Sequence, residues 1–151
     1  FVYLLLGIYT DYGHDCDYQV ETYCFDTYEN SWTQKSDIPD DLSFIYSDEA
    51  HSVVVGDTVF ILARDSGNFL GYDTNMDNWE SFSLPELSHT EGAVCVYEGK
   101  IYLGGGKFEE GNTDIIEVYD PDEDVWETSD LKLPGKMANF YLFAVTSSGL
   151  K

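Results

Sequence analysis

Three short stretches of the sequence carry residue types that could hold a metal or a phosphate. The stretch 14–17 (His-Asp-Cys-Asp) has metal-binding side chains, but adjacent residues of an extended loop point in different directions, and zinc sites use better-spaced sets. The stretch 120–124 alternates Asp like a calcium loop, yet Val125 and Leu131 stand where such a loop needs Gly and Glu. The stretch 104–107 (Gly-Gly-Gly-Lys) lacks the flanking residues of a phosphate loop. We therefore expect no metal and no cofactor.

Catalytic constellations are the next candidates for chemistry. His14, His51 and His89 are scattered along the chain, each in a segment that we expect to be a loop or a junction between sheets. None of them stands in a spacing typical of a nucleophile and its general base. The sequence therefore favours a binding protein over an enzyme.

The charge of the chain restricts its partners. Among 151 residues, 7 are Lys or Arg and 29 are Asp or Glu, which gives a formal net charge of −22. Nucleic acid and anionic membrane surfaces attract basic proteins, so this balance excludes both as expected partners. Basic or mixed-charge protein segments are what such a charge attracts. The 3 Trp, 12 Tyr and 9 Phe argue for a folded chain rather than a disordered one.

The cysteines and the apolar runs indicate where the protein works. Cys16, Cys24 and Cys95 are odd in number and irregularly spaced, unlike a secreted disulfide framework. The longest apolar run, 1–9, is far shorter than the ~20 residues of a membrane helix. We therefore expect a cytoplasmic protein with no membrane partner. Because the chain begins at Phe1 without an initiator Met, we also expect it to be a piece of a longer protein.

An internal repeat organises the sequence. Trp32, Trp79 and Trp126 recur every 47 residues. Seven residues before each Trp stands an aromatic residue followed by Asp, in the pairs Phe25-Asp26, Tyr72-Asp73 and Tyr119-Asp120. These marks in one register predict three structural units.

Each unit reads as consecutive antiparallel strands, because short apolar and β-branched runs alternate with tight polar turns. The predicted strands are 2–7, 19–26 and 30–35; then 51–55, 58–63, 68–73 and 77–82; then 92–97, 100–105, 114–119 and 124–129. A further strand is predicted at 138–146 as the first strand of another unit. No window shows a helical period, so the chain is predicted to be all-β.

These marks resemble the kelch repeat, in which an apolar strand ends in a Gly pair and is followed by Tyr-Asp and then Trp. The third unit matches best, with Gly104-Gly105, Tyr119-Asp120 and Trp126. The first two units lack the Gly pair. The resemblance implies that each unit is a blade of a β-propeller, with its first strand at the central channel and the Trp strand outermost. It also implies that the Trp rings are buried between adjacent sheets.

The length corresponds to about three blades, too few to close a propeller of 4–8 blades. We therefore expect one kelch propeller segment over 1–151, with repeats at about 1–35, 51–82 and 92–129, as part of a six-bladed ring. The remaining blades are expected from the rest of a longer chain, with a second copy as the alternative.

Loops between the second and third strands of a blade share one face with the segments that connect blades, and their variable length favours that loop-bearing face for binding. Tyr beside Asp suits Lys- and Arg-bearing peptides through cation–π contacts and charge pairing. The expected partner-binding residues are Tyr9, Asp11, Tyr12, His14, Asp17, Tyr46, Asp48, Glu49, Arg64, Lys107, Phe108 and Glu109. We also expect much of the negative charge on this face.

The resemblance implies a protein-interaction module, most plausibly the substrate-recognition domain of a BTB-kelch adaptor of a cullin-3 ubiquitin ligase. Cullin-3 would then bind only through regions outside this chain. An actin-associated kelch scaffold of the cytoskeleton is the alternative among binding proteins, and a propeller-based enzyme is the alternative from another class.

Overall fold

The structure is a computed structural model that describes residues 1–11, 16–39, 50–63, 67–109 and 111–145, with the backbone alone for those between 4 and 20 and for 63. The described residues form strands and connecting segments, which confirms the predicted all-β class. None of them belongs to a helix that is long and apolar enough to cross a membrane.

Among the described residues, three larger antiparallel sheets follow one another along the chain. The first contains β1 (Val2–Asp11), β2 (Cys16–Asp26) and β3 (Ser31–Gln34) in that order. The second contains β4 (Ala50–Val55), β5 (Thr58–Ala63), β6 (Asn68–Asp73) and β7 (Asn78–Ser81). The third contains β8 (Ala93–Tyr97), β9 (Lys100–Gly104), β12 (Ile115–Asp120) and β13 (Val125–Lys132). Within each of these sheets the strands pair in the order of the sequence, as in the blades of a propeller.

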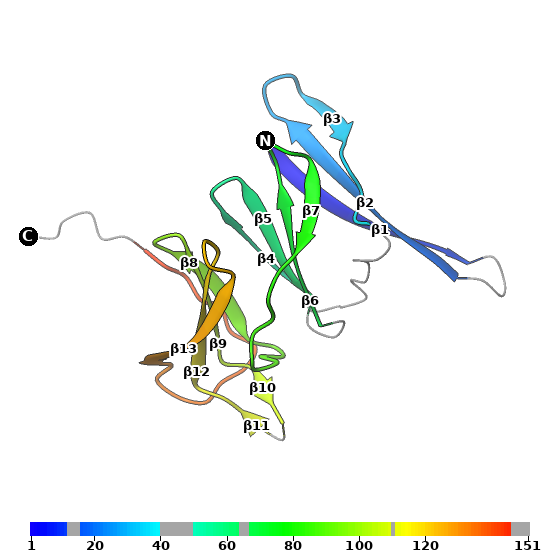
Figure 1. The fold of residues 1–151 in the computed structure, drawn as a ribbon. Coiled ribbons are helices and arrows are strands. Elements are labelled where there is room, and N and C mark those ends of the chain that lie inside the picture. The colour runs from blue at the N-terminus through cyan, green and yellow to red at the C-terminus, as the bar shows by residue number, and fades with distance from the viewer. Residues whose placement is uncertain (12–15, 40–49, 64–66, 110, 146–151) are drawn as a thin grey trace, which may run out of the picture.

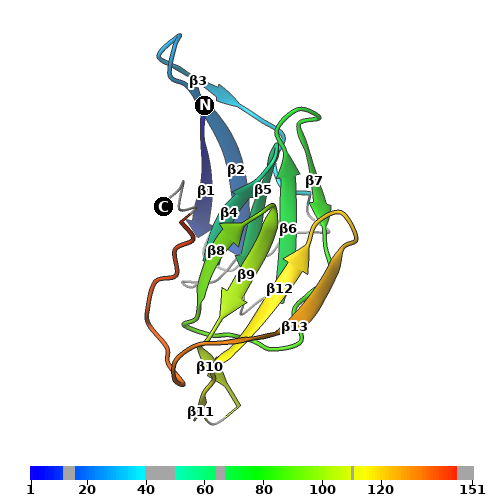
Figure 2. The same ribbon diagram turned by 90° about the vertical axis from the view of Figure 1, so that its left-hand side faces the viewer.

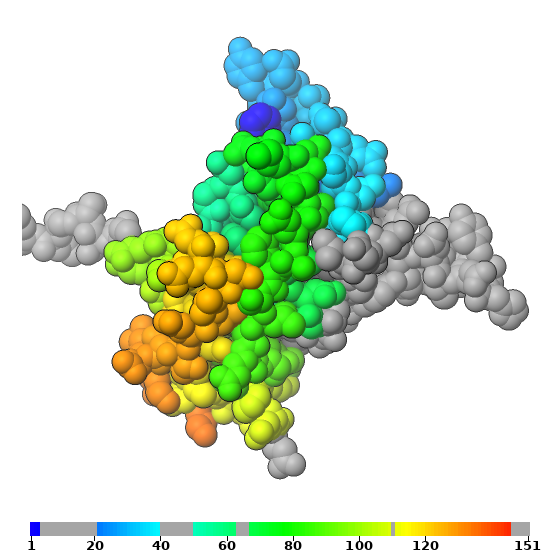
Figure 3. Space-filling model, viewed as in Figure 1, coloured from blue at the N-terminus to red at the C-terminus, as the bar shows by residue number. Residues whose placement is uncertain are grey.

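The sheets stack side by side, as Figures 1 and 2 show. The second sheet lies between the first and the third, and the space-filling view shows it in contact with both (Figure 3). The first strands β4 and β8 of neighbouring sheets contact each other. The arrangement is that of a partial β-propeller, as the kelch resemblance implied, with first strands at one edge of the stack and Trp-bearing strands at the other.

Alternating side chains fill the two spaces between the sheets. Phe60 and Leu62 of β5 join the buried cluster against the third sheet, whereas Ile61 joins the cluster against the first. Successive side chains of a strand point to opposite faces, so a middle sheet needs apolar residues at every position. This requirement explains the uninterrupted apolar run of β5.

The aromatic-Trp spacing of the repeat is explained by a cross-strand pair. Phe25, Tyr72 and Tyr119 stand directly opposite Trp32, Trp79 and Trp126, with ring centroids 4.9, 5.1 and 5.0 Å apart. The expectation that all three Trp rings are buried holds for Trp79, is met in part by the half-buried Trp126 and is wrong for Trp32. Trp79 is 6% exposed, but Trp32 is 52% exposed, because no described residues cover the outer face of the first sheet.

Three other expectations differ from the structure. β1 and β2 continue beyond the predicted strands, because their Tyr, Thr, Ile and Val residues favour extended pairing. A short hairpin, β10 (Lys107–Phe108) and β11 (Gly111–Asn112), occupies the predicted loop. The strand predicted over 138–146 is not formed in its described part, 138–145. The backbone here has other partners, since the Asn139 N–H donates to the Glu91 carbonyl oxygen at 2.8 Å.

Candidate interaction face

The repeat residues hold the beginning of each segment that connects two sheets. The Trp79 Nε1–H donates to the carbonyl oxygen of Ser36 at 2.9 Å, and the Trp126 Nε1–H donates to that of Ser83 at 2.7 Å. Both Trp side chains thus bind backbone that follows the outermost strand of the preceding sheet. The same contact therefore fixes where two connecting segments start.

A carboxylate in the last tight turn of the second and of the third sheet strengthens this contact. Asp77 Oδ1 accepts the Ser36 N–H at 2.8 Å and the Tyr72 hydroxyl at 2.7 Å. Asp124 repeats the arrangement with Ser83 and Tyr119. The Ser36 N–H, followed by the Tyr72 hydroxyl, holds the pKa of Asp77 below its ordinary value. The pKa of Tyr72 is raised, first by burial and then by Asp77.

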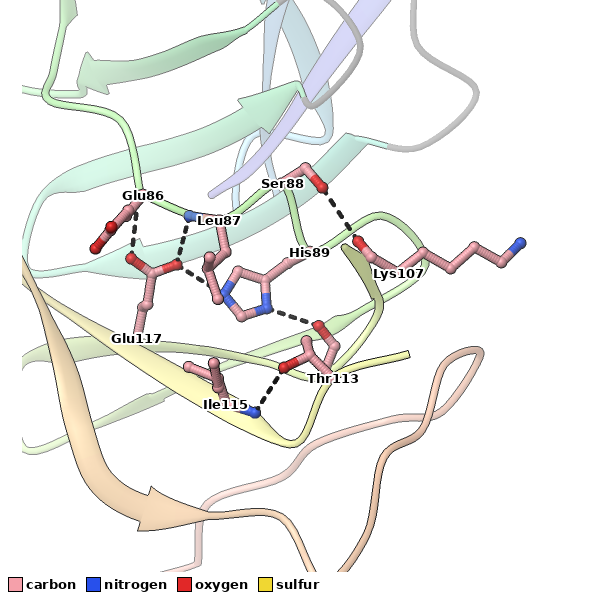
Figure 4. Close-up of polar contacts among 9 residues, drawn as sticks. Glu86, Leu87, Ser88, His89, Lys107, Thr113, Ile115 and Glu117 are labelled. Carbon is pink, nitrogen blue, oxygen red and sulfur yellow. Dashed lines mark hydrogen bonds and ion pairs between the residues drawn. The ribbon is translucent and has the colours of Figure 1, made fainter. Parts of the chain in front are cut away.

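The segment between the second and third sheets lies on the loop-bearing face and is held by Glu117 of β12. Glu117 Oε1 accepts the Glu86 N–H at 2.8 Å, and Oε2 accepts the Leu87 N–H at 3.0 Å. His89 Nε2 lies 2.8 Å from the same Oε2 (Figure 4). Glu117 is 1% exposed and His89 is completely buried. One carboxylate thus fixes both the backbone and a side chain of this segment.

The pKa of Glu117 reflects this position. Burial raises it, but hydrogen bonds from His89 and from the backbone N–H groups of Leu87 and Glu86 outweigh burial and leave it below the ordinary value. The carboxyl is therefore ionised at neutral pH.

Glycine is required where the chain passes under this segment. A Cβ on Gly106 would lie 2.5 Å from the carbonyl oxygen of Thr90 and 2.6 Å from that of His89, and the residue has a φ of +82°. A Cβ on Gly105 would meet the Phe140 ring at 2.6 Å. The Gly run at the end of β9 thus lets its backbone lie close to the backbone of the segment 83–92, because glycine has no Cβ to clash there.

The hairpin β10–β11 projects from this face beside the segment 83–92 (Figures 1 and 2). Lys107, Phe108 and Glu109 are exposed there. The Lys107 ammonium forms an ion pair with Glu91, and the Asn139 side chain donates to the other Glu91 oxygen at 2.7 Å. Of the predicted binding residues, Lys107, Phe108 and Glu109 are the ones whose side chains the structure describes.

The other predicted residues divide into two groups. Tyr9, Asp11 and Asp17 lie on β1 and β2 rather than in the expected loop, and the backbone pairs Tyr9 with Tyr18. The rest lie outside the described residues: Tyr12, His14, Tyr46, Asp48, Glu49 and Arg64. Their part in binding stays a prediction.

Two of the pockets where the connecting segments meet the sheets are also lined by residues of the second sheet. One has a volume of about 210 Å³ and is lined by Leu62, Gly67 and the consecutive residues 84–88, so its wall is largely apolar. The other has a volume of about 390 Å³ and lies between Ala50-His51, Glu91-Gly92 and residues 139–141. The connecting segment 83–92 therefore contributes to both.

Acidic residues also lie away from the loop-bearing face, and the expectation that much of the negative charge lies on that face stays a prediction. Several lie in the tight turns at the opposite end of the sheets, where they cap backbone. Asp73 Oδ1 accepts the N–H groups of Asn75 and Met76 at 2.8 and 2.9 Å, and Asp26 plays the same part in the first sheet. The Asp that follows each aromatic mark thus has a structural role, because Asp favours turns by binding nearby backbone N–H groups.

The calcium-like stretch 120–124 is also engaged in turn and junction contacts. Asp120 forms an ion pair with Lys100 at 2.6 Å, and Asp124 accepts from Ser83 and Tyr119. In the described part of the chain, no three His, Cys, Asp or Glu side chains lie together as metal ligands would.

The sequence reading missed Asp77, Asp124, Glu117 and the burial of His89. One signal for Glu117 was present, because it interrupts the apolar strand sequence Ile-Ile-Glu-Val-Tyr. A carboxylate in a strand that is buried on both faces needs a partner. The sequence could not name that partner, since His89 lies 28 residues away.

Comparisons with known proteins agree with this architecture. Residues 90–128 match the Kelch motif family. The chain is 27% identical to Kelch-like protein 21 of Danio rerio over 108 residues, which are 68% of this chain and 16% of that protein. It is 29% identical to Kelch-like protein 38 of Danio rerio over 93 residues, or 58% and 16% of the two chains. Identity to human Kelch-like protein 26 is 38% over 69 residues, or 44% and 11%.

The aligned residues thus span about a sixth or less of these relatives. The match to the Kelch motif covers the third unit, whose Gly run, Tyr-Asp pair and Trp fit the repeat best. Residues 90–128 therefore carry a kelch repeat, and these similarities, together with the stacked antiparallel sheets, confirm the resemblance of the chain to kelch-repeat proteins.

Proposed function

We propose that this kelch segment is a protein-interaction module that binds a basic or mixed-charge partner through its loop-bearing face. The observation that carries the proposal is the construction of that face. Segment 83–92 is held at its start by Trp126 and Asp124 and further along by Glu117. Variable loops held on a rigid scaffold are where proteins commonly bind their partners.

The chemistry of the face supports a partner of this kind. The pocket of about 210 Å³ has walls of Leu62, Leu84, Pro85 and Leu87, and the exposed Glu86 belongs to the same wall. Such a pocket suits an apolar side chain that is followed by Lys or Arg. The net charge of −22 adds a long-range attraction for basic segments. Binding without catalysis is the role that these features favour.

For the whole protein, we propose a cytoplasmic BTB-kelch adaptor of a cullin-3 ubiquitin ligase. The support for this step is the similarity to proteins named Kelch-like, each far longer than the aligned region. In that arrangement the present chain recognises the substrate, and cullin-3 binds elsewhere in the protein.

A charge reversal on the full-length protein tests the role of the face. Glu86→Lys alters the pocket wall, while Glu123→Lys makes the same change at an exposed tight turn on the opposite face. Affinity capture with quantitative mass spectrometry should show partners lost from the first variant and retained by the second. Raising the salt concentration should weaken the same contacts, because the attraction is partly electrostatic. Equal loss from both variants, or from neither, would refute binding at this face.

The adaptor proposal needs a separate test. Cullin-3 should co-precipitate with the full-length protein and also with its Glu86→Lys variant, because the proposed cullin-binding region lies outside this chain. If the full-length protein does not recover cullin-3, the adaptor role is wrong even where partner binding at the loop-bearing face holds. Recovery of actin filaments instead would favour the cytoskeletal role.

A further inference from the structure

The buried ring of His89 has an unusual pair of neighbours. Nε2 lies 2.8 Å from Oε2 of Glu117 (Figure 4). Nδ1 lies 2.6 Å from the carbonyl oxygen of Gly105. A carbonyl oxygen only accepts hydrogen bonds, so Nδ1 carries a proton. The contact at Nε2 faces a carboxyl oxygen that also accepts the Leu87 N–H. A hydrogen bond between Nε2 and Oε2 therefore requires a second proton, carried either by the ring or by the carboxyl group.

That second proton belongs to the imidazole. Hydrogen bonds from His89 and two backbone N–H groups outweigh the effect of burial and keep the pKa of Glu117 below its ordinary value. Because each ring nitrogen faces an oxygen that accepts, an ionised Glu117 requires an imidazolium at His89 that donates from both nitrogens. If the ring lost this proton, the lone pair of Nε2 would face a carboxylate oxygen at hydrogen-bond distance, and the attraction would become a repulsion.

Other charged groups around the ring do not replace Glu117. Along the same segment, Glu91 is paired with Lys107 and Asn139, and Glu86 has its side chain exposed. From the turn after β9, Gly105 offers its carbonyl oxygen, and the Lys107 ammonium is held by Glu91. Glu117 is therefore the charged group in direct contact with the ring among the described residues.

The backbone of the segment is strained where the ring is held. His89 has a φ of +45° and Glu91 a φ of +59°, the left-handed region that residues with a side chain seldom adopt. Such conformations persist when surrounding contacts impose them. The Glu117–His89 contact is one of the contacts that hold this conformation, so its loss favours release of the segment.

We propose that His89 and Glu117 form a proton-dependent latch that holds the segment 83–92 against the third sheet. With the proton bound, the ion pair and the carbonyl contact keep the segment in place. As pH rises and the imidazolium loses its proton, the latch opens, and the pocket wall formed by residues 84–88 loosens with it. The inference concerns the chain itself and holds whichever partner the loop-bearing face binds.

The latch is tested by hydrogen exchange of the full-length protein, measured by mass spectrometry. The measurements run from about pH 6 to about pH 9, around the ordinary titration range of histidine. After correction for the intrinsic exchange rate, protection of 83–92 should fall by up to about tenfold per pH unit once the proton is lost. Peptides from β5 and β6 serve as internal controls and should show no such slope. His89→Arg keeps a cation that does not titrate and should remove the slope. His89→Gln should leave the segment weakly protected at every pH.

A second measurement does not depend on any variant. The ¹⁵N shifts of the imidazole at neutral pH should show both nitrogens of His89 protonated. An unprotonated Nε2 in a protein whose segment is fully protected would overturn the proposal. So would a wild-type slope equal to that of the β5 and β6 peptides, whether or not the Arg variant folds.

Discussion

Removal of Trp79 should destabilise the chain far more than removal of Trp32, although the two residues hold the same place in the repeat. Trp79 is 6% exposed, packs on Tyr72 with ring centroids 5.1 Å apart and donates to the Ser36 carbonyl oxygen. Replacing such a buried ring by Ala costs about 3–5 kcal/mol. Trp32 is 52% exposed, so about half of the burial energy is at stake, roughly 2 kcal/mol.

The comparison is made by urea unfolding of the 151-residue chain, followed by far-ultraviolet circular dichroism so that loss of a fluorophore does not disturb the signal. The midpoint should fall much further for Trp79→Ala than for Trp32→Ala, with similar slopes. Trp79→Phe should lie between wild type and Trp79→Ala, because it keeps an aromatic ring and loses the hydrogen bond, worth about 1 kcal/mol. Equal destabilisation by the two Ala variants would refute the argument that the neighbouring sheet decides the value of each Trp.

Three further predictions follow from the junctions between sheets. Tyr119→Phe removes a buried hydroxyl that donates to a turn carboxylate, and it should lower the free energy of unfolding by about 1–2 kcal/mol. The same urea titration measures this loss, and an unchanged free energy of unfolding would mean that the hydrogen bond adds no stability. The pKa of Asp77 is depressed because the Ser36 N–H and a tyrosine hydroxyl donate to its carboxylate. The stability that this ionised carboxylate contributes should therefore be complete above about pH 4, the ordinary pKa of Asp, and be lost as pH falls through the lower pKa of the folded state. When the free energy of unfolding is plotted against pH, Asp77→Asn should lose stability less steeply in acid than wild type, and parallel curves would contradict this. Gly106→Ala should cost more than about 2 kcal/mol in thermal unfolding because of its φ of +82° and the close backbone, whereas Gly111→Ala, with open space at its Cβ, should be nearly neutral.

Much of the fold could be predicted from the sequence because its signals are local. The strands around the tight turns at 56–57 and 98–99 follow from apolar runs that end at those turns. The seven-residue spacing from Tyr72 to Trp79 is that of a cross-strand pair in a hairpin. Boundaries were less predictable at β1 and β2, whose pairing extends through residues that suit either a strand or a loop.

The candidate site was less predictable, because its contacts join residues that are distant in sequence. The exposed positions of Lys107, Phe108 and Glu109 could be expected from a polar loop between two strands. The support beneath them could not, since Glu117 and His89 meet only after two sheets have stacked. A carboxylate inside an apolar strand indicates that some partner exists, without indicating which one.

The sequence by itself determined the repeat, the antiparallel strand order and the resemblance to the kelch repeat, because turns, alternation and aromatic pairs act over a few residues. Only the tertiary structure decided which repeat residues are buried and which segments are held. Trp32 and Trp79 carry the same local signal and differ in exposure, because burial requires a neighbouring sheet and a described neighbour covers only one of them. In the same way, His89 is one of three scattered histidines in the sequence, and packing against β12 surrounds it with hydrogen-bond acceptors.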